Sequence, residues 1–474
     1  MESLKATVFD FARYSELTRK FLAWERATLK GYEVRSRVES TVEEEPSIHH
    51  VKQAADNFRK SLITELETHD NRKVTEEREI REEIVAHFKS IFTGQPSPDH
   101  SCKDRFLEGV RGVLTAQNPE QNEMGSNCAA QLVDAQALDQ GTAGSIPGSA
   151  LLGSRFPIDA LTDTLTNVEF KFVLAASKPN KSPGSDGIPF EFYSKFWESI
   201  APHFLEMAEN IFAKQRILPS QGRATIRLVP KVPQPKRMTD YRPISLLNTD
   251  YKLLASVLAN RLRKSLPNAL LSHQKGGVPG RYIFDSLCLF RDVIDDACRK
   301  SKSPRGKREP VNAAIIAYDL EKAYDLVNRD TLWETMEAMG YPSQFIDRLK
   351  PIFSITQLCP LNGSSILGTI DEAQPMRQGC PLSIHLFGIN IEPLLVRLSN
   401  TVAGYSLNGE GIRVRAYVDD LVVFVSSHID ILRACKTIEE FCAGTKANPG
   451  TRRRAGVGLR YQQHYCKRVW FVWT

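Results

Sequence analysis

Three aspartates stand where short apolar runs of the chain end. Asp319 closes the first run, and Asp419 and Asp420 separate the second run from the third. Runs of this length predict buried strands, and a polar pair between two of them predicts a hairpin. Asp319 and Asp419 are 100 positions apart (419 − 319), so only the tertiary fold can bring them together. The runs are AAIIAYDL (313–320), IRVRAY (412–417) and LVVFVS (421–426).

Carboxylates at the tips of adjacent strands point to metal chemistry. Three of them cannot all stay ionised in a small space without cations. Mg²⁺ suits them, because it prefers hard oxygen ligands and keeps waters that phosphate oxygens can replace. Two such ions, about 4 Å apart, would activate a 3′-hydroxyl and stabilise a leaving pyrophosphate. The simpler alternative is that an Asp pair in a turn is only solvated and that an Asp at a strand end caps a helix.

Elements that would position these aspartates begin at about residue 156. Apolar residues recur at helical spacing in four segments, and ATIRLVPK (224–231) alternates like a strand. This mixture predicts an α+β fold in which helices pack on a mostly antiparallel sheet. The four helical segments are 156–177, 191–215, 251–262 and 331–340.

The chain before residue 156 divides into two regions. Residues 1–95 are highly charged and helical in pattern, with the clearest helix predicted at 75–93, where Thr75 can cap the start and Gly94 the end. Residues 96–155 are rich in Gln, Asn, Gly and Ser without any period, which predicts a flexible linker.

The composition is that of an intracellular protein with room for a substantial core. The chain has 474 residues, 42% of them hydrophobic, and a net charge of +6 that suits contact with phosphate backbones without requiring it. Nine cysteines form no C-x-x-C pair and no zinc-type cluster. The start of the chain has no signal-peptide pattern, and no run reaches the roughly 18 apolar residues of a membrane span. We expect a soluble protein of the cytoplasm or nucleus, without membrane contact.

Seven segments, in order along the chain, resemble the motifs of reverse transcriptases encoded by non-LTR (LINE-type) retrotransposons. Their ordered occurrence over more than half of the chain is far more specific than any single motif. The segments are KSPGSDGIPFEFY (181–193), LVPK (228–231), DYRPISLLNTDYKLLASVLANRL (240–262), HQKGGVPGRYIFDSL (273–287), YDLEKAYDLVNRDTLW (318–333), RQGCPLSIHLF (377–387) and AYVDDLVVFVS (416–426).

This resemblance implies a right-hand polymerase fold with fingers and an antiparallel palm sheet. It also implies an RNA-directed DNA polymerase that joins deoxynucleoside triphosphates to a DNA primer on an RNA template. Asp319, Asp419 and Asp420 match the catalytic, metal-binding aspartates of the palm. Two Mg²⁺ ions are the implied cofactors, with Mn²⁺ as a substitute.

Five further residues match the nucleotide-binding positions of the family. Lys231 and Arg242 match the fingers residues that hold the triphosphate, which suits a point charge and a forked guanidinium. Tyr324 matches the aromatic gate against the ribose 2′-hydroxyl, and Gln378 and Gly379 match the motif that lines the nucleotide pocket. Without the resemblance, the two cations would be ordinary solvated charges, Tyr324 a core residue and Gln378 a turn cap.

The chain departs from the family pattern at two places. Val418 replaces the usual Ala of the aspartate hairpin, and Ile384-His385 replaces the usual Pro-Leu after RQGCPLS. Losing that proline shifts the expected start of the next helix. Gly276, Gly277 and Arg281 belong to the segment that the resemblance places near the template.

Both ends also depart from the family. Residues 1–95 resemble the helical segment that joins an endonuclease to the polymerase, but no endonuclease-like segment is visible, so that activity would come from elsewhere. The resemblance stops after 442–448, and we expect a truncated thumb and a basic, divergent tail at 443–474. Two other interpretations stay open: an inactive remnant that binds nucleic acid, and another template-dependent polymerase, which Tyr324 opposes if the product is RNA. Residues 1–95 could also be a separate interaction module.

Overall fold

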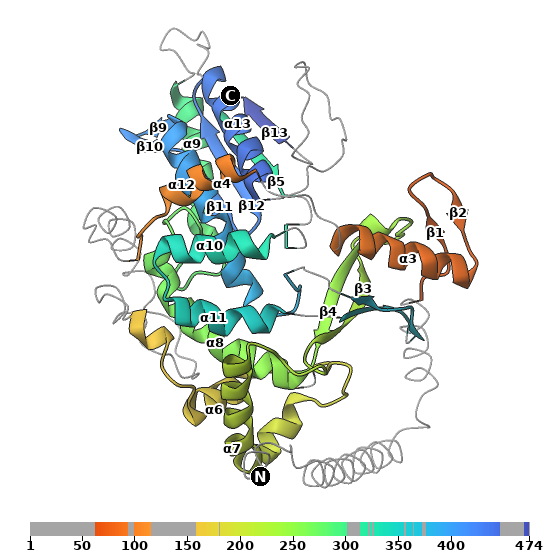
Figure 1. Cartoon of the computed structure of the whole chain (residues 1–474). Helices are drawn as coiled ribbons and strands as arrows, with labels where there is room; N and C mark the ends of the chain where they lie inside the picture. The colour runs from red at the N-terminus through yellow and green to blue at the C-terminus, as the bar shows by residue number, and fades with distance from the viewer. Residues whose placement is uncertain are drawn as a thin grey trace, which may run out of the picture.

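The computed structural model describes most of the chain between Leu62 and Thr445, and one strand near the end (Figure 1). Phe92, Asp319 and residues 469–473 are described by their backbone alone. The described residues are 62–92, 99–114, 158–179, 181–300, 313–320, 323–324, 327–354, 357–363, 365–371, 376–445 and 469–473.

One sheet, which we call the carboxylate sheet, carries all three aspartates at one end. Its strand order is β11 (Val414–Tyr417), β12 (Asp420–Val425), β5 (Ala314–Asp319) and β13 (Val469–Trp473). Every neighbouring pair is antiparallel. The sheet lies in the upper part of Figure 1.

A second sheet, which we call the outer sheet, stands to the side of the helical body, where Figure 1 labels β3 and β4. β3 (Arg223–Pro230) pairs antiparallel with β4 (Tyr241–Leu247) and parallel with β6 (Gln357–Asn362). The short strands β7 (Ser365–Ile366) and β8 (Ile370–Asp371) pair with β6. The parallel pair joins segments that are far apart in the chain, so the outer sheet is built from two separate regions of sequence.

Helix α12 (Ser383–Thr401) is the centre of the core. It contacts α8 (Thr249–Ala269), α10 (Arg329–Met339), α13 (His428–Thr445) and strand β11. Leucine and isoleucine recur all round its first turns, and most of them are fully buried. A helix that is apolar on every side is stable only inside a protein, which explains its central position.

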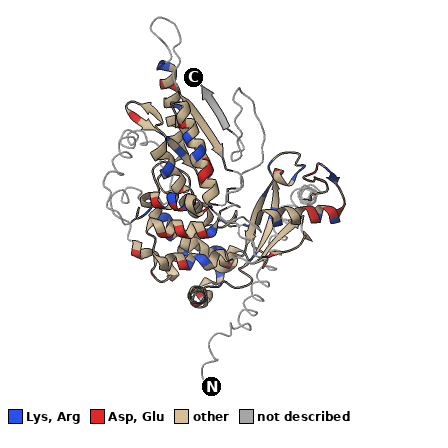
Figure 2. Ribbon diagram, turned by 45° about the horizontal axis from the view of Figure 1, so that its top comes forward, with Lys and Arg blue, Asp and Glu red and all other residues tan. Residues whose placement is uncertain are grey.

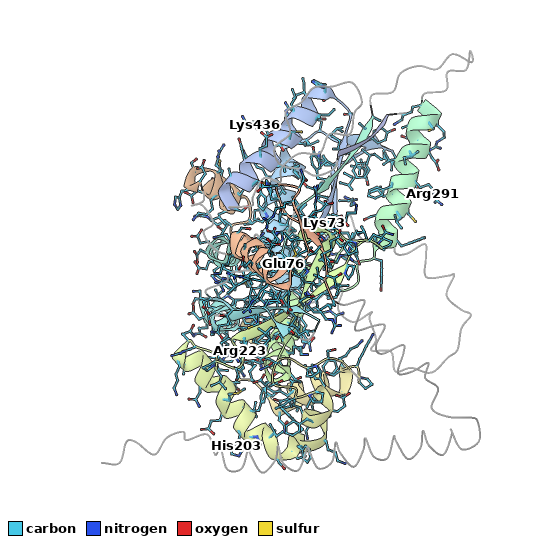
Figure 3. All side chains as sticks on the ribbon, turned by 90° about the vertical axis from the view of Figure 1, so that its right-hand side faces the viewer. Lys73, Glu76, His203, Arg223, Arg291 and Lys436 are labelled. Carbon is cyan, nitrogen blue, oxygen red and sulfur yellow. The ribbon has the colours of Figure 1, made fainter. Side chains whose placement is uncertain are left out.

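The lower part of the molecule is a layer of helices around α8. It contains η4 (Ile158–Leu161), α6 (Asn167–Ala176), α7 (Phe190–Lys214) and α11 (Ser343–Phe353). Phe170 of α6 packs against Trp197 and Phe204 of α7, with ring centroids 5.5 and 5.1 Å apart. Figure 3 shows how far this layer lies from the opposite end, with His203 on α7 and Lys436 on α13 at the two extremes.

Smaller elements complete the described chain. Helix α9 (Ile283–Lys300) packs on β9 (Tyr405–Leu407), and the hydroxyl of Tyr405 donates a 2.8 Å hydrogen bond to Asp296 between them. Figure 2 shows Lys and Arg interspersed with Asp and Glu along the helices. The elements are β1 (Leu66–Glu67), β2 (Lys73–Val74), η5 (Met238–Asp240), α9 (Ile283–Lys300), β9 (Tyr405–Leu407) and β10 (Glu410–Ile412).

The α+β class predicted from the sequence is confirmed, but the helix predicted at 156–177 is broken. Thr166 accepts from the backbone N–H of Glu169, whose carboxylate accepts from Thr166 in return, so a capping box starts α6 there. The buried Arg261 of α8 binds the Glu169 carboxylate at 2.6 and 2.8 Å. Its guanidinium also donates to the carbonyls of Leu161, Asp163 and Thr164.

The structure differs from the expected flexible linker (96–155) at residues 99–114. Asp99 caps helix α4 (His100–Gly109) by accepting from the backbone N–H groups of Ser101 and Cys102. Phe106 is buried and packs edge to face on Phe441 of α13 at 5.4 Å. Helix α4 also contacts α10 and α12, so this segment is part of the core; residues 115–155 lie outside the described chain.

The ends show two further differences. Helix α13 continues through Thr445, and residues 469–473 of the expected divergent tail form β13, which pairs with β5 along its length. Near the start, the helix predicted at 75–93 is confirmed as α3 (Glu77–Phe92), which packs on β6 and β8. Residues 1–61 lie outside the described chain.

Candidate active site

The backbone brings the three aspartates to one end of the carboxylate sheet. Asp420 begins β12 and pairs in register with Asp319, which ends β5. Tyr417 and Asp420 close a two-residue turn made of Val418 and Asp419, so Asp419 is the direct neighbour of the paired position. Facing residues in an antiparallel pair lie about 5 Å apart, which brings positions from distant parts of the chain together.

The strands behind the aspartates are apolar and buried, which fixes this end of the sheet. Tyr318, Leu421 and Val423 are at most 3% exposed, whereas Asp420 is exposed and Asp419 half-buried. A one-residue slip would turn the apolar side chains to the other face, so burial determines the register.

Tyr324 lies beside this end of the sheet. Its ring stacks on Phe387 of α12, with centroids 4.9 Å apart. Burial, together with the negative charge of Asp419, raises the pKa of Tyr324 to about 12. The phenol is therefore neutral at physiological pH.

Gln378 and Gly379 connect Tyr324 to the outer sheet. The backbone N–H of Met376 donates to the carbonyl of Tyr324 (3.1 Å), and the carbonyl of Gln378 accepts from the N–H of Ser245 on β4 (2.8 Å). Gly379 has a φ of +125°, and a Cβ there would lie 2.6 Å from the carbonyl oxygen of Ser245. Only glycine fits this close approach of two backbones without strain.

Lys231 and Arg242 stand together near the end of the β3–β4 hairpin. Lys231 follows β3 directly; its backbone N–H donates to the carbonyl of Asp240 (2.7 Å) and its ammonium group to that of Thr239 (3.0 Å). Arg242 pairs with Val229 across the two strands. Both side chains are exposed, and Arg242 is three residues before the Ser245 that contacts Gln378.

The donor set fits a hard cation. All three groups are carboxylates, and oxygen ligands of this kind are those that Mg²⁺ prefers. Among the side chains that the structure describes, no three His, Cys, Asp or Glu groups gather around one point, and Asp319 is described by its backbone only.

Arg281, expected near the template, is bound to the backbone at the end of α8. Its guanidinium donates to four backbone carbonyls around the end of α8, and these bonds occupy most of its donors. The acceptors are the carbonyls of Pro267, Leu270, Leu271 and Gln274.

Sequence reasoning missed Gln274, although it lies inside the motif HQKGGVPGR. Its side chain is fully buried and hydrogen-bonds both backbone groups of Val418, next to Asp419. A single Gln has no periodicity that could have marked it.

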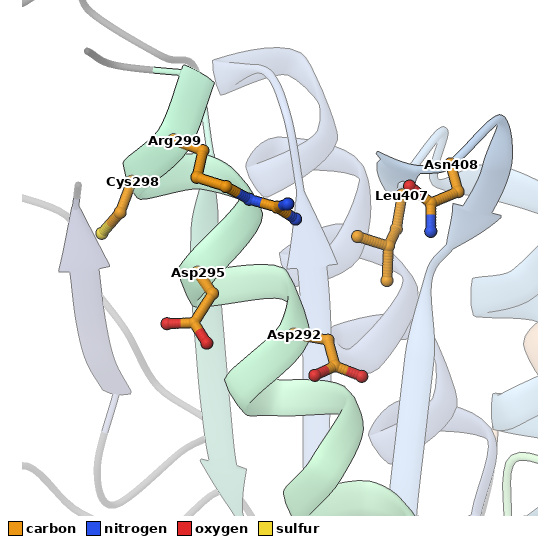
Figure 4. A pocket seen from close by; sticks show the side chains of 6 residues that line it. All are labelled: Asp292, Asp295, Cys298, Arg299, Leu407 and Asn408. Carbon is orange, nitrogen blue, oxygen red and sulfur yellow. The ribbon is translucent and has the colours of Figure 1, made fainter.

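A hollow of about 560 Å³ lies between α9 and the β9–β10 hairpin (Figure 4). It includes none of the predicted site residues. Its lining is Asp292, Asp295, Cys298, Arg299, Leu407 and Asn408.

No helix in the described part of the chain is long and apolar enough to cross a bilayer.

Comparisons with known proteins give a consistent result. Residues 230–448 match the family described as reverse transcriptase (RNA-dependent DNA polymerase). The chain is 31% identical over 301 residues to the uncharacterized 149 kDa protein of transposon TX1 from Xenopus laevis. The aligned region covers 63% of this chain and 22% of that protein. It is 24% identical to the Pol polyprotein of the type-2 retrotransposable element R2DM from Drosophila melanogaster, over 53% of this chain and 22% of that protein. It is also 24% identical to the Pol polyprotein of the type-1 retrotransposable element R2 from Popillia japonica, over 58% of this chain and 36% of that protein. The chain therefore spans only 22% to 36% of the length of these relatives.

Proposed function

The chain carries a reverse transcriptase domain of the non-LTR retrotransposon kind, and we propose that it works as an RNA-directed DNA polymerase. It would add deoxynucleotides to the 3′-hydroxyl of a DNA primer paired with an RNA template. The observation that carries this proposal is the pairing of Asp420 with Asp319, with Asp419 in the adjoining turn.

In this proposal the carboxylate sheet with α10, α12 and α13 is the palm, and the outer sheet with α6–α8 forms the fingers. The sequence boundaries of 156–442 for this unit are kept, with α4 and β13 joining it from outside those limits. Residues 1–95 are proposed as the helical region that precedes the polymerase, residues 115–155 as the linker and residues 446–468 as the divergent part of the tail.

Asp319, Asp419 and Asp420 would hold two Mg²⁺ ions, with Mn²⁺ as a substitute. When bound, the ions would lower the pKa of the primer 3′-hydroxyl and neutralise charge on the leaving pyrophosphate. The contribution of the chain is rigidity, because the buried strands β5 and β12 keep the carboxylates at fixed spacing. Charged groups that are already in place stabilise a transition state more than groups that must move into place during the reaction.

The nucleotide would lie between the outer sheet and the carboxylate sheet. The exposed Lys231 and Arg242 would bind the triphosphate, and Gln378 with Gly379 would line the base and sugar pocket. Tyr324 would exclude the ribose 2′-hydroxyl. Two observations support this assignment: the stack on Phe387 holds the Tyr324 ring in place, and its raised pKa keeps the phenol uncharged beside phosphates.

Primer extension tests the proposal. The purified chain would receive poly(A) RNA primed with oligo(dT), dTTP, and Mg²⁺ or Mn²⁺, with Asp419→Ala in parallel. Asp292→Ala is the matched control, since it removes an exposed aspartate that lines the α9 hollow and no site residue. We expect metal-dependent extension that Asp419→Ala abolishes and Asp292→Ala retains.

Other outcomes would favour the alternatives. Template binding without extension would support an inactive remnant that binds nucleic acid. Extension with UTP as readily as with dTTP would support a polymerase whose product is RNA. Cutting of the target DNA would in either case require an endonuclease from another protein or region.

A further inference from the structure

The turn that carries Asp419 has an unfavourable backbone conformation. Val418 has a φ of +59°, in the left-handed region that β-branched residues avoid. Asp419 follows it directly, so any relaxation of Val418 would rotate the peptide that leads into Asp419 and Asp420. Conformations of this kind persist only where surrounding contacts enforce them.

Gln274 makes those contacts. Its Oε1 accepts from the backbone N–H of Val418 at 3.0 Å, and its Nε2 donates to the carbonyl of Val418 at 3.3 Å. The N–H belongs to the peptide before Val418 and the carbonyl to the peptide after it, so one amide holds both peptide planes. The same Oε1 also accepts from the N–H of Gly276 at 2.9 Å, and the side chain is 0% exposed.

The backbone around Gln274 is itself attached to the hairpin. The N–H of Ala416 donates to the carbonyl of His273, and the N–H of Lys275 donates to the carbonyl of Ala416, both at 2.9 Å. Gln274 and Ala416 therefore form a parallel bridge at the edge of β11. A Cβ on Gly276 would lie 2.4 Å from Cγ2 of Val418, so the glycine allows the segment to lie directly against the turn.

The other side of this segment is fixed to α12. Nδ1 of His385 lies 3.1 Å from the carbonyl oxygen of Gly277, and burial lowers the pKa of His385 to about 4, so the neutral ring donates from Nδ1. A Cβ on Gly277 would lie 3.0 Å from Cγ1 of Ile384. The two departures from the family pattern thus lie against adjacent glycines, Val418 against Gly276 and residues 384–385 against Gly277.

We propose that Gln274 is a positioning residue that holds the Val418 turn in its left-handed conformation and thereby orients Asp419 and Asp420. We call the pair of hydrogen bonds from Gln274 to Val418 the clamp. The expected effect on kcat rests on the proposed polymerase function, whereas the clamp itself does not. Its physical basis is that an amide has one donor and one acceptor group, which match the two backbone groups of a single residue. No hydrocarbon side chain of similar size can supply them.

The test compares Gln274→Met, which keeps the length but loses both hydrogen bonds, with Gln274→Glu, which keeps the acceptor only. The matched control is Gln221→Met, because Gln221 is also buried (1% exposed) and hydrogen-bonded, to Asp250 and the N–H of Leu218. Two readouts are needed: amide hydrogen exchange of the peptide 414–421 in the free protein, and kcat and KM for dTTP.

For Gln274→Met we expect faster exchange in the peptide 414–421, with α8 and α12 unchanged. We also expect a fall in kcat on the order of tenfold to a hundredfold with little change in KM, because small displacements of reacting groups have effects of this size. Gln274→Glu should be intermediate. Gln221→Met should lower the thermal midpoint without a change in kcat or in this peptide.

A double variant gives the sharper result. Glycine adopts positive φ without strain, so Val418→Gly should make the clamp less necessary. Gln274→Met should then cost much less kcat in the Val418→Gly background than in the wild type. Unchanged exchange in the turn would overturn the clamp whether or not the chain polymerises. Faster exchange with unchanged kcat, or equal losses in both backgrounds, would overturn the catalytic consequence while leaving the polymerase proposal intact.

Discussion

The burial of Glu392 should make the stability of the protein depend on pH. It lies on α12 and is 1% exposed. Its Oε1 accepts from the N–H of Leu271 at 2.7 Å, and its Oε2 has no hydrogen-bond partner among the described residues. Burial raises its pKa from 4.5 to about 7, although the Leu271 hydrogen bond and the charge of Arg281 act in the opposite direction. Tyr341 is the other titratable group that senses its charge.

The sign follows from comparing the folded and unfolded chains. Below the unfolded pKa of 4.5 Glu392 is protonated in both states, so its burial carries no charge penalty. As the pH rises toward the folded pKa of about 7, the unfolded chain loses the proton first and the folded state becomes less favourable. Integrated from about pH 5 to about pH 8, the loss in free energy of unfolding is about 2 to 3 kcal/mol.

Replacement of Glu392 by Gln tests this reasoning. The amide keeps the acceptor for the Leu271 N–H but does not titrate. The stability of Glu392→Gln relative to the wild type should therefore rise by about 2 to 3 kcal/mol between low and high pH. Urea denaturation of both proteins at several pH values and constant ionic strength measures the difference. Burial lowers the pKa values of His273 and His385 to about 3 and about 4. Both residues occur in both proteins, so their contributions to the pH dependence of stability cancel in the comparison. A difference in stability that does not change with pH would refute the assignment.

Four further outcomes follow from the contacts described above. Arg261→Met should lower the free energy of unfolding by about 3 to 5 kcal/mol in urea denaturation, because it breaks a buried ion pair and strands three carbonyls. Phe106→Ala should cost about 3 kcal/mol and make the α4 segment more sensitive to limited proteolysis; an unchanged digest would contradict its place in the core. Tyr324→Ala should increase ribonucleotide incorporation up to roughly a hundredfold in single-nucleotide extension, with dNTP use as the control. Gly379→Ala should raise KM for dTTP in primer extension and lower the thermal midpoint, since its φ is positive and its Cβ would lie 2.6 Å from the carbonyl oxygen of Ser245.

Much of the secondary structure followed from local patterns. Apolar runs predicted β5 and the β11–β12 hairpin, and helical spacing predicted α3, α7, α8 and α10. The break at Thr166 was legible as Thr-x-x-Glu but was hidden by an apolar spacing that continued through it. Helix α4 was missed because its few apolar residues, such as Phe106, have meaning only against α13.

The geometry of the site was harder to predict from the sequence than the positions of the strands. Nothing local specifies that Asp319 faces Asp420, because register depends on which apolar side chains share a core. The parallel pairing of β3 with β6 and the pairing of β13 with β5 are likewise tertiary events. The family roles of Lys231 and Arg242 came from resemblance alone, and their assignment remains a proposal.

The two sheets are interleaved along the chain, and this has a consequence for biosynthesis. β3 must wait for β6, which is translated after β5, and β5 must wait for β12, which is translated after β6. At ribosomal speeds of about 5 to 20 residues per second, β5 emerges roughly 5 to 20 seconds before the strand that carries Asp420. During that interval an apolar strand has an unpaired edge, which is the kind of surface that aggregates or recruits chaperones. The chain therefore brings its aspartates together only after β12 has followed β5 out of the ribosome.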